Sequence, residues 1–204
     1  MTRSPSASAS EAPAWGLVSA ALAPTLLIGG WTVAAAVQPR PFSSVRDTIS
    51  QLAAVGMPHR WVMTLALAGL GLCHIVTAAA LRPAATPGRA VLAVGGVATA
   101  LVATSPLPSL GGSTTHTAAA TLAFVGLSLW PASATATSAR RDVLSRPVCL
   151  TAAAVLAALV VWLFAALQSG SPLTGLAERV AAGAQSLWPL VVMVGVRRRV
   201  DAHH

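Results

Sequence analysis

Six long apolar stretches alternate with short polar segments along this chain. The stretches run over about 14–37, 61–81, 90–103, 115–132, 148–167 and 176–196. About 20 apolar residues are enough for a helix to cross the hydrocarbon core of a bilayer. The third stretch is the shortest, and we expect part of 104–110 to extend it. The pattern therefore predicts an all-α integral membrane bundle of six transmembrane helices.

The first stretch has a second interpretation, as a cleaved signal peptide. It ends in three alanines, at 34–36, which resemble a cleavage site. The apolar region of a signal peptide is usually about 7–15 residues long, and this stretch is longer. We therefore favour an uncleaved first span.

The segment between the first two apolar stretches has a helical pattern of its own. Val45, Ile49 and Leu52 recur at the spacing of one helical face. Ser44 and Asp47, three positions apart, resemble a capping box with aspartate in place of glutamate. The pattern predicts a short amphipathic helix of about three turns, too short to span a bilayer, at the interface between lipid and water.

Composition supports a membrane protein and argues against a soluble one. Hydrophobic residues make up 55% of the 204 positions, charged residues 9%, and the mean hydropathy is +0.72. Soluble domains usually carry about 25% charged residues. The net charge of +8 comes from arginines in the gaps between apolar stretches. This distribution predicts attraction to membrane lipids and no binding of nucleic acid.

The arginines also predict the orientation of the chain. Nine of the 13 basic residues fall on the side of the two termini and four on the other side. The positive-inside rule then predicts a plasma-membrane protein with both termini in the cytoplasm. We expect a disordered cytoplasmic tail over 1–13, a transmembrane domain over 14–196 and a basic cytoplasmic tail over 197–204.

With six spans, the first, third and fifth loops share the outer face. Residues that stand out as polar in this apolar chain fall on these loops or at the adjoining span ends: Arg46, Asp47, Ser50, His116, Glu178 and Arg179. A carboxylate near hydrocarbon is costly unless it is paired. One interpretation is structural, with the acids held by neighbouring arginines. The other is a ligand-facing polar site.

Three parts of the sequence resemble a known family. They are QPRPFSSVRDTISQLAAVGMPHRWVM, a histidine opening the fourth apolar stretch, and GLAERV before the sixth. Together they resemble the bacterial integral-membrane family catalogued as domain of unknown function 998, over 14–196. The resemblance implies a six-helix membrane protein without an established activity. The motifs carry over to Asp47, Ser50, His116, Glu178 and Arg179.

Three functions remain open. In the leading one, a pocket of Arg46, Asp47, His116, Glu178 and Arg179 binds a lipid headgroup or small amphiphile at the outer face. The alternative is a lipid hydrolase in which Ser50 or a metal-bound water attacks and His116 is the base. The third is a small-solute transporter, which needs a polar path past His74. We predict no cofactor and no metal site; the oligomeric state and the protein partners stay open.

Overall fold

The computed structural model describes residues 12–135 and 143–201. In these residues it contains seven helices and no strand. They are α2 (Ala14–Ala36), α3 (Ile49–Leu52), α4 (Arg60–Ala80), α5 (Thr86–Thr104), α6 (Thr114–Ser133), α7 (Arg146–Ser169) and α8 (Thr174–Asp201). Residues 1–11 of the tail predicted over 1–13, and the final residues 202–204, lie outside the described residues.

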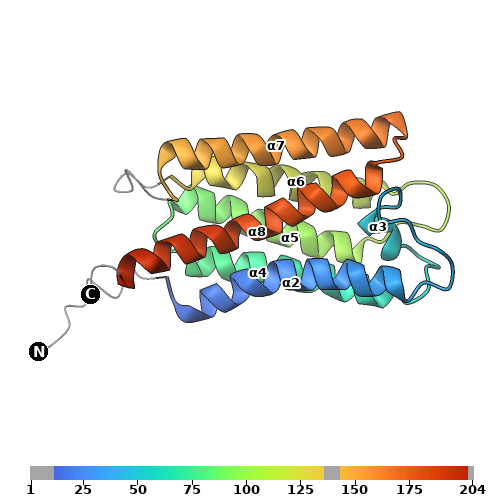
Figure 1. The fold of residues 1–204 in the computed structure, drawn as a ribbon, viewed down its shortest axis with the longest axis horizontal. Helices are drawn as coiled ribbons and strands as arrows, with labels where there is room; N and C mark the ends of the chain where they lie inside the picture. Colours follow the sequence, from blue (N-terminus) through green and yellow to red (C-terminus); the bar gives the residue numbers. More distant parts are fainter. Residues whose placement is uncertain (1–11, 136–142, 202–204) are drawn as a thin grey trace, which may run out of the picture.

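The six long helices run side by side and form a closed ring (Figure 1). The packing order follows the chain: α2 packs on α4, then α5, α6, α7 and α8 follow, and α8 packs back on α2. The described ends of the chain lie together at one end of the bundle, and α3 lies at the other. We call these the terminal end and the α3 end.

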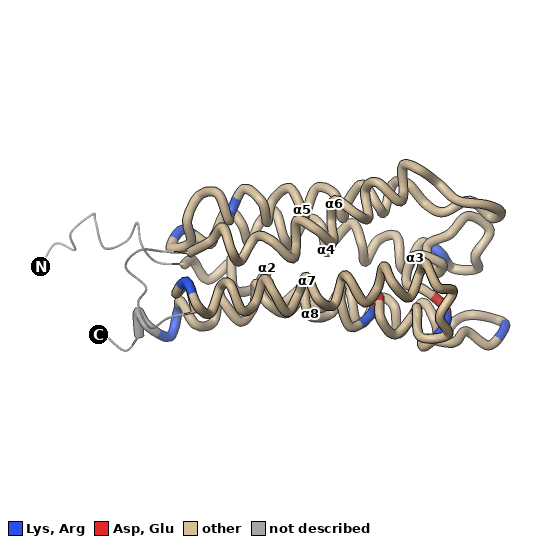
Figure 2. The backbone as a smooth tube through the Cα atoms, turned by 90° about the horizontal axis from the view of Figure 1, so that it is seen from above, with Lys and Arg blue, Asp and Glu red and all other residues tan. Residues whose placement is uncertain are grey.

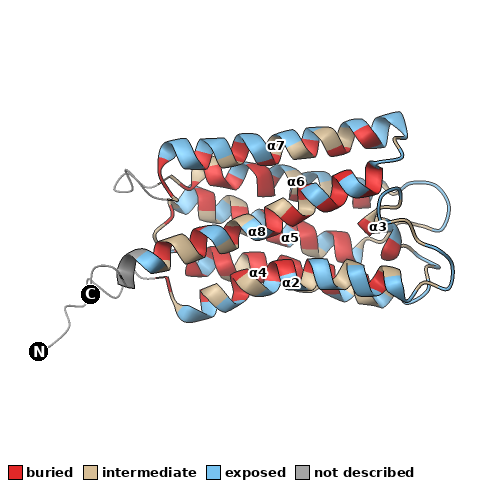
Figure 3. Ribbon diagram, viewed as in Figure 1, coloured by how far each residue is buried: buried red, intermediate tan, exposed pale blue. Residues whose placement is uncertain are grey.

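Five of the long helices are long and apolar enough to cross a membrane: α2, α4, α5, α7 and α8 as far as Arg198. α6 has 20 residues but does not reach the same apolarity, because its first turn reads TTHT. The outward faces carry exposed apolar side chains such as Leu72 and Val161, which is the pattern of helices solvated by lipid (Figure 3). Five spans are therefore supported where the sequence predicted six.

The third apolar stretch differs from its prediction at both ends. α5 begins earlier, at Thr86, because Pro87 occupies one of the first helical positions, where its missing N–H costs nothing. It ends at Thr104, so 105–110 does not extend it. The loop that follows instead joins the first loop, where Val55 N–H donates to Leu107 O at 2.8 Å.

The short helix between the first two spans is one turn long rather than three. Asp47 accepts from Ser43 N–H at 2.7 Å, and Thr48 then takes an extended conformation that prevents a longer helix. The capping box is formed by Thr48 and Gln51, not by the serine-aspartate pair that the sequence favoured. Ile49 and Leu52 are buried in the bundle, so α3 plugs its end.

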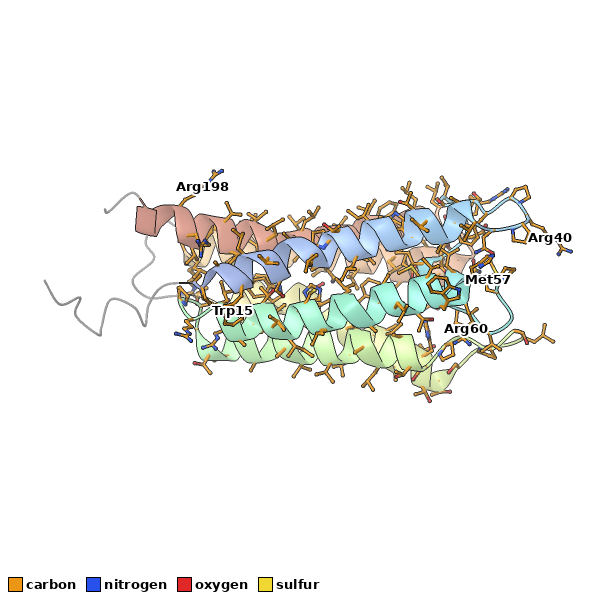
Figure 4. The ribbon with its side chains drawn as sticks, turned by 90° about the horizontal axis from the view of Figure 1, so that it is seen from below. Trp15, Arg40, Met57, Arg60 and Arg198 are labelled. Carbon is orange, nitrogen blue, oxygen red and sulfur yellow. The ribbon has the colours of Figure 1, made fainter. Side chains whose placement is uncertain are left out.

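Charged positions gather toward the two ends of the bundle (Figure 2). Arg198 lies at the terminal end and Arg40 at the α3 end, where Met57 and Arg60 also lie (Figure 4). Between them, helices approach closely through small residues. A methyl group on Gly71 would lie 2.8 Å from the backbone nitrogen of Ala100, so α4 and α5 pack with their backbones nearly in contact.

Candidate functional site

The start of α8 holds the first loop against the bundle. Leu176 N–H donates to Val45 O at 2.9 Å. Arg179 Nη1 donates to Ser44 O and Asp47 O, both at 2.8 Å. Gly175 lies directly against the backbone of Asp47, leaving no room for a side chain. The backbone of α8 and the Arg179 side chain thus fix the first loop, which leads into α3 and Ser50.

Arg179 is buried and is held through one nitrogen, Nη1, while its Nε and Nη2 have no hydrogen-bond partner among the described residues. Besides the two loop carbonyls, Nη1 donates to Gly175 O at 3.0 Å. The guanidinium carbon lies 5.9 Å from the ring centre of Trp31 and 5.8 Å from that of Phe42, within the range of cation–π attraction. These contacts assign Arg179 to holding the loop.

Glu178 is also buried, and both of its carboxylate oxygens face α3. Oε2 accepts from Ile49 N–H, and Oε1 accepts from Ser50 Oγ at 3.1 Å. A buried carboxylate needs hydrogen-bond donors or a counter-charge to offset its lost hydration. Here α3 supplies those donors, which explains how an acid is retained in an apolar bundle.

His116 is the third member of a hydrogen-bonded series that also contains Ser50 and Glu178. Ser113 Oγ caps α6 by accepting from the backbone N–H of His116 at 3.2 Å. This bond fixes the backbone from which the His116 ring extends. Nδ1 lies 2.8 Å from Ser105 O, and Nε2 lies 3.2 Å from Ser50 Oγ. Since a carbonyl oxygen can only accept, Nδ1 carries a proton and Nε2 faces Ser50.

The protons shared by these three side chains can be counted. With His116 neutral and Glu178 ionised, Nε2 and Oε1 are both acceptors, and the single hydroxyl proton of Ser50 can serve one of them. Both contacts are hydrogen bonds at once only if a second proton sits on Nε2 or on the carboxyl group. We call these three side chains the His116–Ser50–Glu178 network.

A pocket of about 180 Å³ opens beside this network. One part of its wall is polar and contains Thr48, Ser50, His116 and Glu178. The rest comes mainly from α6 and α7 and is largely apolar: Leu107, Thr117, Ala120, Thr121, Phe124, Leu163, Phe164 and Leu167. We call it the α6–α7 pocket; it has the amphipathic wall that an amphiphile requires.

The remaining residues predicted for the site lie elsewhere at the α3 end. The Asp47 side chain contributes to a separate basin of about 1020 Å³, formed by the first and third loops together with Arg40. Arg46 is exposed. The structure thus joins His116, Ser50 and Glu178 in one network, whereas Arg179 meets Asp47 only through its backbone carbonyl.

The network contains the contact that a serine hydrolase needs, in an unusual order. When His116 is neutral, its Nε2 carries no proton and faces Ser50 Oγ, as a general base must. In the familiar triad the acid orients the histidine, whereas here the carbonyl of Ser105 does so and Glu178 binds the serine. Ile49 N–H, which could otherwise bind an oxyanion, is already bonded to Glu178.

Two further observations concern ligands and missed residues. The described residues contain no group of three or more His, Cys, Asp or Glu side chains arranged to hold a metal ion. Sequence reasoning missed Ser105, whose role comes from its backbone carbonyl and leaves no side-chain signal. It also missed Phe164 and the other α7 residues of the pocket, which read as ordinary lipid-facing positions.

Comparison with known proteins identifies a family and no activity. The model of the family described as "Protein of unknown function (DUF998)" matches residues 12–195, so the chain belongs to this family. Searches of the curated proteins and of the solved structures each returned no match.

Proposed function

We propose that this member of the DUF998 family binds a lipid or another small amphiphile in the α6–α7 pocket. The observation that carries the proposal is the wall of this pocket, polar at Ser50 and His116 and apolar along Phe164 and Leu167. An amphiphile would place its head against the network and its chain between α6 and α7. This proposal narrows the broader pocket expected from the sequence.

The charges around the pocket favour a particular kind of head. Its lining contains Glu178 and no arginine. Neither Arg179, whose Nη1 bonds loop carbonyls, nor the exposed Arg46 lines the pocket. Ser50 and His116 offer hydrogen bonds to a hydroxyl, amide or ester group. We therefore infer a neutral or cationic head rather than a phosphate monoester or a free carboxylate.

Orientation and span number belong to the same proposal. We infer that α6 also spans the membrane, since it packs between α5 and α7 along the ring. The α3 end would face outward and both termini the cytoplasm, because Arg82, Arg89 and Arg146 follow the positive-inside rule at the terminal end. Reporter fusions after residue 112 and after residue 201 test this: only the second should report a cytoplasmic location.

Binding is tested by filling the pocket. Thr121 is exposed and lines the pocket, so Thr121→Phe adds a ring there without disturbing the core. Thr25→Phe is the matched control, at an exposed threonine of α2. Purified variants in nanodiscs are titrated with a spin-labelled monoacylglycerol. Thr121→Phe should abolish its saturable binding and Thr25→Phe should leave it unchanged; no saturable binding to the wild type would overturn the proposal.

A second candidate is an ester hydrolase of the same amphiphiles. It is favoured by the 3.2 Å approach of His116 Nε2 to Ser50 Oγ. In that case Ser50 Oγ would attack the ester carbonyl while His116 takes its proton, and the ester C–O bond would break as His116 returns that proton to the departing glycerol. Water would then hydrolyse the acyl-serine, releasing the fatty acid and restoring the Ser50 hydroxyl. Fatty-acid release from monoacylglycerol by the wild type, lost in Ser50→Ala, supports this candidate. Binding without release by the wild type rejects the hydrolase and leaves the binding protein.

A further inference from the structure

A second cavity, of about 60 Å³, lies inside the bundle next to the Ser50–Glu178 contact. Side chains from α2, α3, α4, α5, α6 and α8 form its wall. Most of this wall is apolar, and its polar members are Ser50, His74, Thr99, Glu178 and Gln185. We call it the inner chamber. It is distinct from the α6–α7 pocket but shares part of its wall, namely Ser50, Ala120, Phe124 and Glu178.

His74 is the group in this chamber that needs explanation. Its side chain is 0% exposed, and neither ring nitrogen has a hydrogen-bond partner among the described residues. An imidazole always presents at least one N–H. Leaving a buried polar atom unpaired is energetically costly. Because His74 lines the chamber, the missing partners can come from its contents.

The chamber has both the room and the polar atoms to hold water. A buried water needs about 10–15 Å³ on this measure and two to four polar partners. The volume of about 60 Å³ therefore accommodates several molecules. Gln185 Nε2 donates to Phe124 O and Ser128 Oγ, which leaves its carbonyl oxygen to accept. Thr99 Oγ1 donates to Gly95 O and retains lone pairs for the same purpose.

We propose that the inner chamber is a hydrated site in which a cluster of water molecules binds His74 and joins it to Glu178. The proposal does not depend on amphiphile binding. It extends the His116–Ser50–Glu178 network into a continuous hydrogen-bonded path from the α3 end to the interior of the bundle. A proton can move along such a path between His116 and His74.

The path is closed toward the terminal end. Beyond His74 the buried side chains belong mainly to an apolar cluster that includes Leu92, Leu127, Trp130 and Met193. The buried hydroxyl groups there are bonded within the protein, Thr77 to Ser19 and Ser19 to the carbonyl of Cys73. Water that enters the chamber therefore communicates with the α3 end alone. His74 is therefore the innermost group of the hydrogen-bonded path. In this conformation the path does not cross the bundle, as a transporter would require.

X-ray hydroxyl-radical footprinting of the full chain in nanodiscs tests the hydrated site, because radicals formed from a bound water oxidise the side chains beside it. His74 should be oxidised at a readily measured rate. Met193 is the internal control, since it is 0% exposed, intrinsically more reactive and packed in the apolar cluster. Oxidation of His74 no faster than that of Met193 would overturn the proposal.

Two variants locate the water. Ala123 lines the chamber and is 7% exposed, and Ala153 on α7 is equally buried without lining it. Ala123→Leu should reduce His74 oxidation to the level of Met193, whereas Ala153→Leu should not. If Ala123→Leu does not fold, Thr99→Val replaces it, since it removes one polar partner of the water at nearly constant volume. Unchanged oxidation of His74 in the folded chamber variant would place the water elsewhere and reject the site.

Discussion

Ser50 Oγ lies 3.1 Å from Glu178 Oε1, although the two residues are 128 positions apart in the chain. This contact joins the loop after the first span to the start of the last helix. The hydroxyl group of Ser50 thus lies between the carboxylate of Glu178 and the ring of His116.

Glu178 should stabilise the protein through α3. Glu178→Leu leaves Ile49 N–H buried without its acceptor and removes the acceptor of Ser50. We expect a loss of about 2–4 kcal/mol in the free energy of unfolding in detergent. Glu178→Gln keeps one oxygen acceptor and should lose less. A leucine variant as stable as the wild type would show that the carboxylate contributes nothing to holding α3.

Arg179 should hold the first loop through the shape of its guanidinium as well as its charge. Arg179→Lys keeps the charge but loses the planar contacts with Trp31 and Phe42 and part of the carbonyl bonds. Backbone amides of 43–56 should exchange faster with deuterated solvent, by about tenfold for a loss of about 1.4 kcal/mol. Exposed Arg46→Lys is the control and should leave exchange unchanged. Equal exchange in both variants would contradict this role.

Gly175 should be intolerant of a side chain where a second helical glycine is not. Gly175→Ala forces a methyl group into the backbone of Asp47 and should loosen the loop. Gly29→Ala, in α2, meets nothing within 4 Å and should stabilise its helix by about 0.5–1 kcal/mol. Thermal unfolding of the two variants gives the comparison. The same sign of change at both positions would be inconsistent with the close approach.

The proton count of the His116–Ser50–Glu178 network predicts a spectroscopic signature at neutral pH. Either the infrared spectrum shows a protonated carboxyl group that disappears in Glu178→Gln, or nitrogen NMR of the His116 ring shows both nitrogens protonated. Nδ1 should carry a proton in each case, because it donates to Ser105 O. A neutral His116 together with an ionised Glu178 would mean that Ser50 bonds to one partner at a time.

The sequence predicted three of the residues that meet, placed Arg46, Asp47 and Arg179 with them in error, and did not predict how the three bond. Alternation of spans and loops indicated that Ser50, His116 and Glu178 lie at one end of the bundle, and the structure brings these three together. The partners of Glu178 could not be foreseen, since Ile49 contributes a backbone N–H. An acid beside Arg179 suggested an ion pair, yet loop carbonyls and two rings hold the arginine.

The short helix shows a second limit. Its apolar spacing was read correctly at Ile49 and Leu52, which are both buried, and wrongly at Val45, which is exposed and precedes the helix. The prediction of three turns was wrong, because Asp47 closes a local turn with Ser43 and leaves Thr48 to start the helix. Local hydrogen bonds of aspartate and threonine compete with a helix, and tertiary contacts decided the outcome. The inner chamber could not be predicted for a related reason. In the sequence His74 is an isolated polar residue, and the chamber forms only when five other helices pack around it.

The measurement that tests the account most directly is a high-resolution structure of the wild-type protein in lipid nanodiscs. We expect elongated density in the α6–α7 pocket, with its polar end within hydrogen-bond distance of Ser50 or His116 and its chain along Phe164 and Leu167. A pocket closed by its own side chains, with amphiphile density found only in the basin beside Arg40, would contradict it.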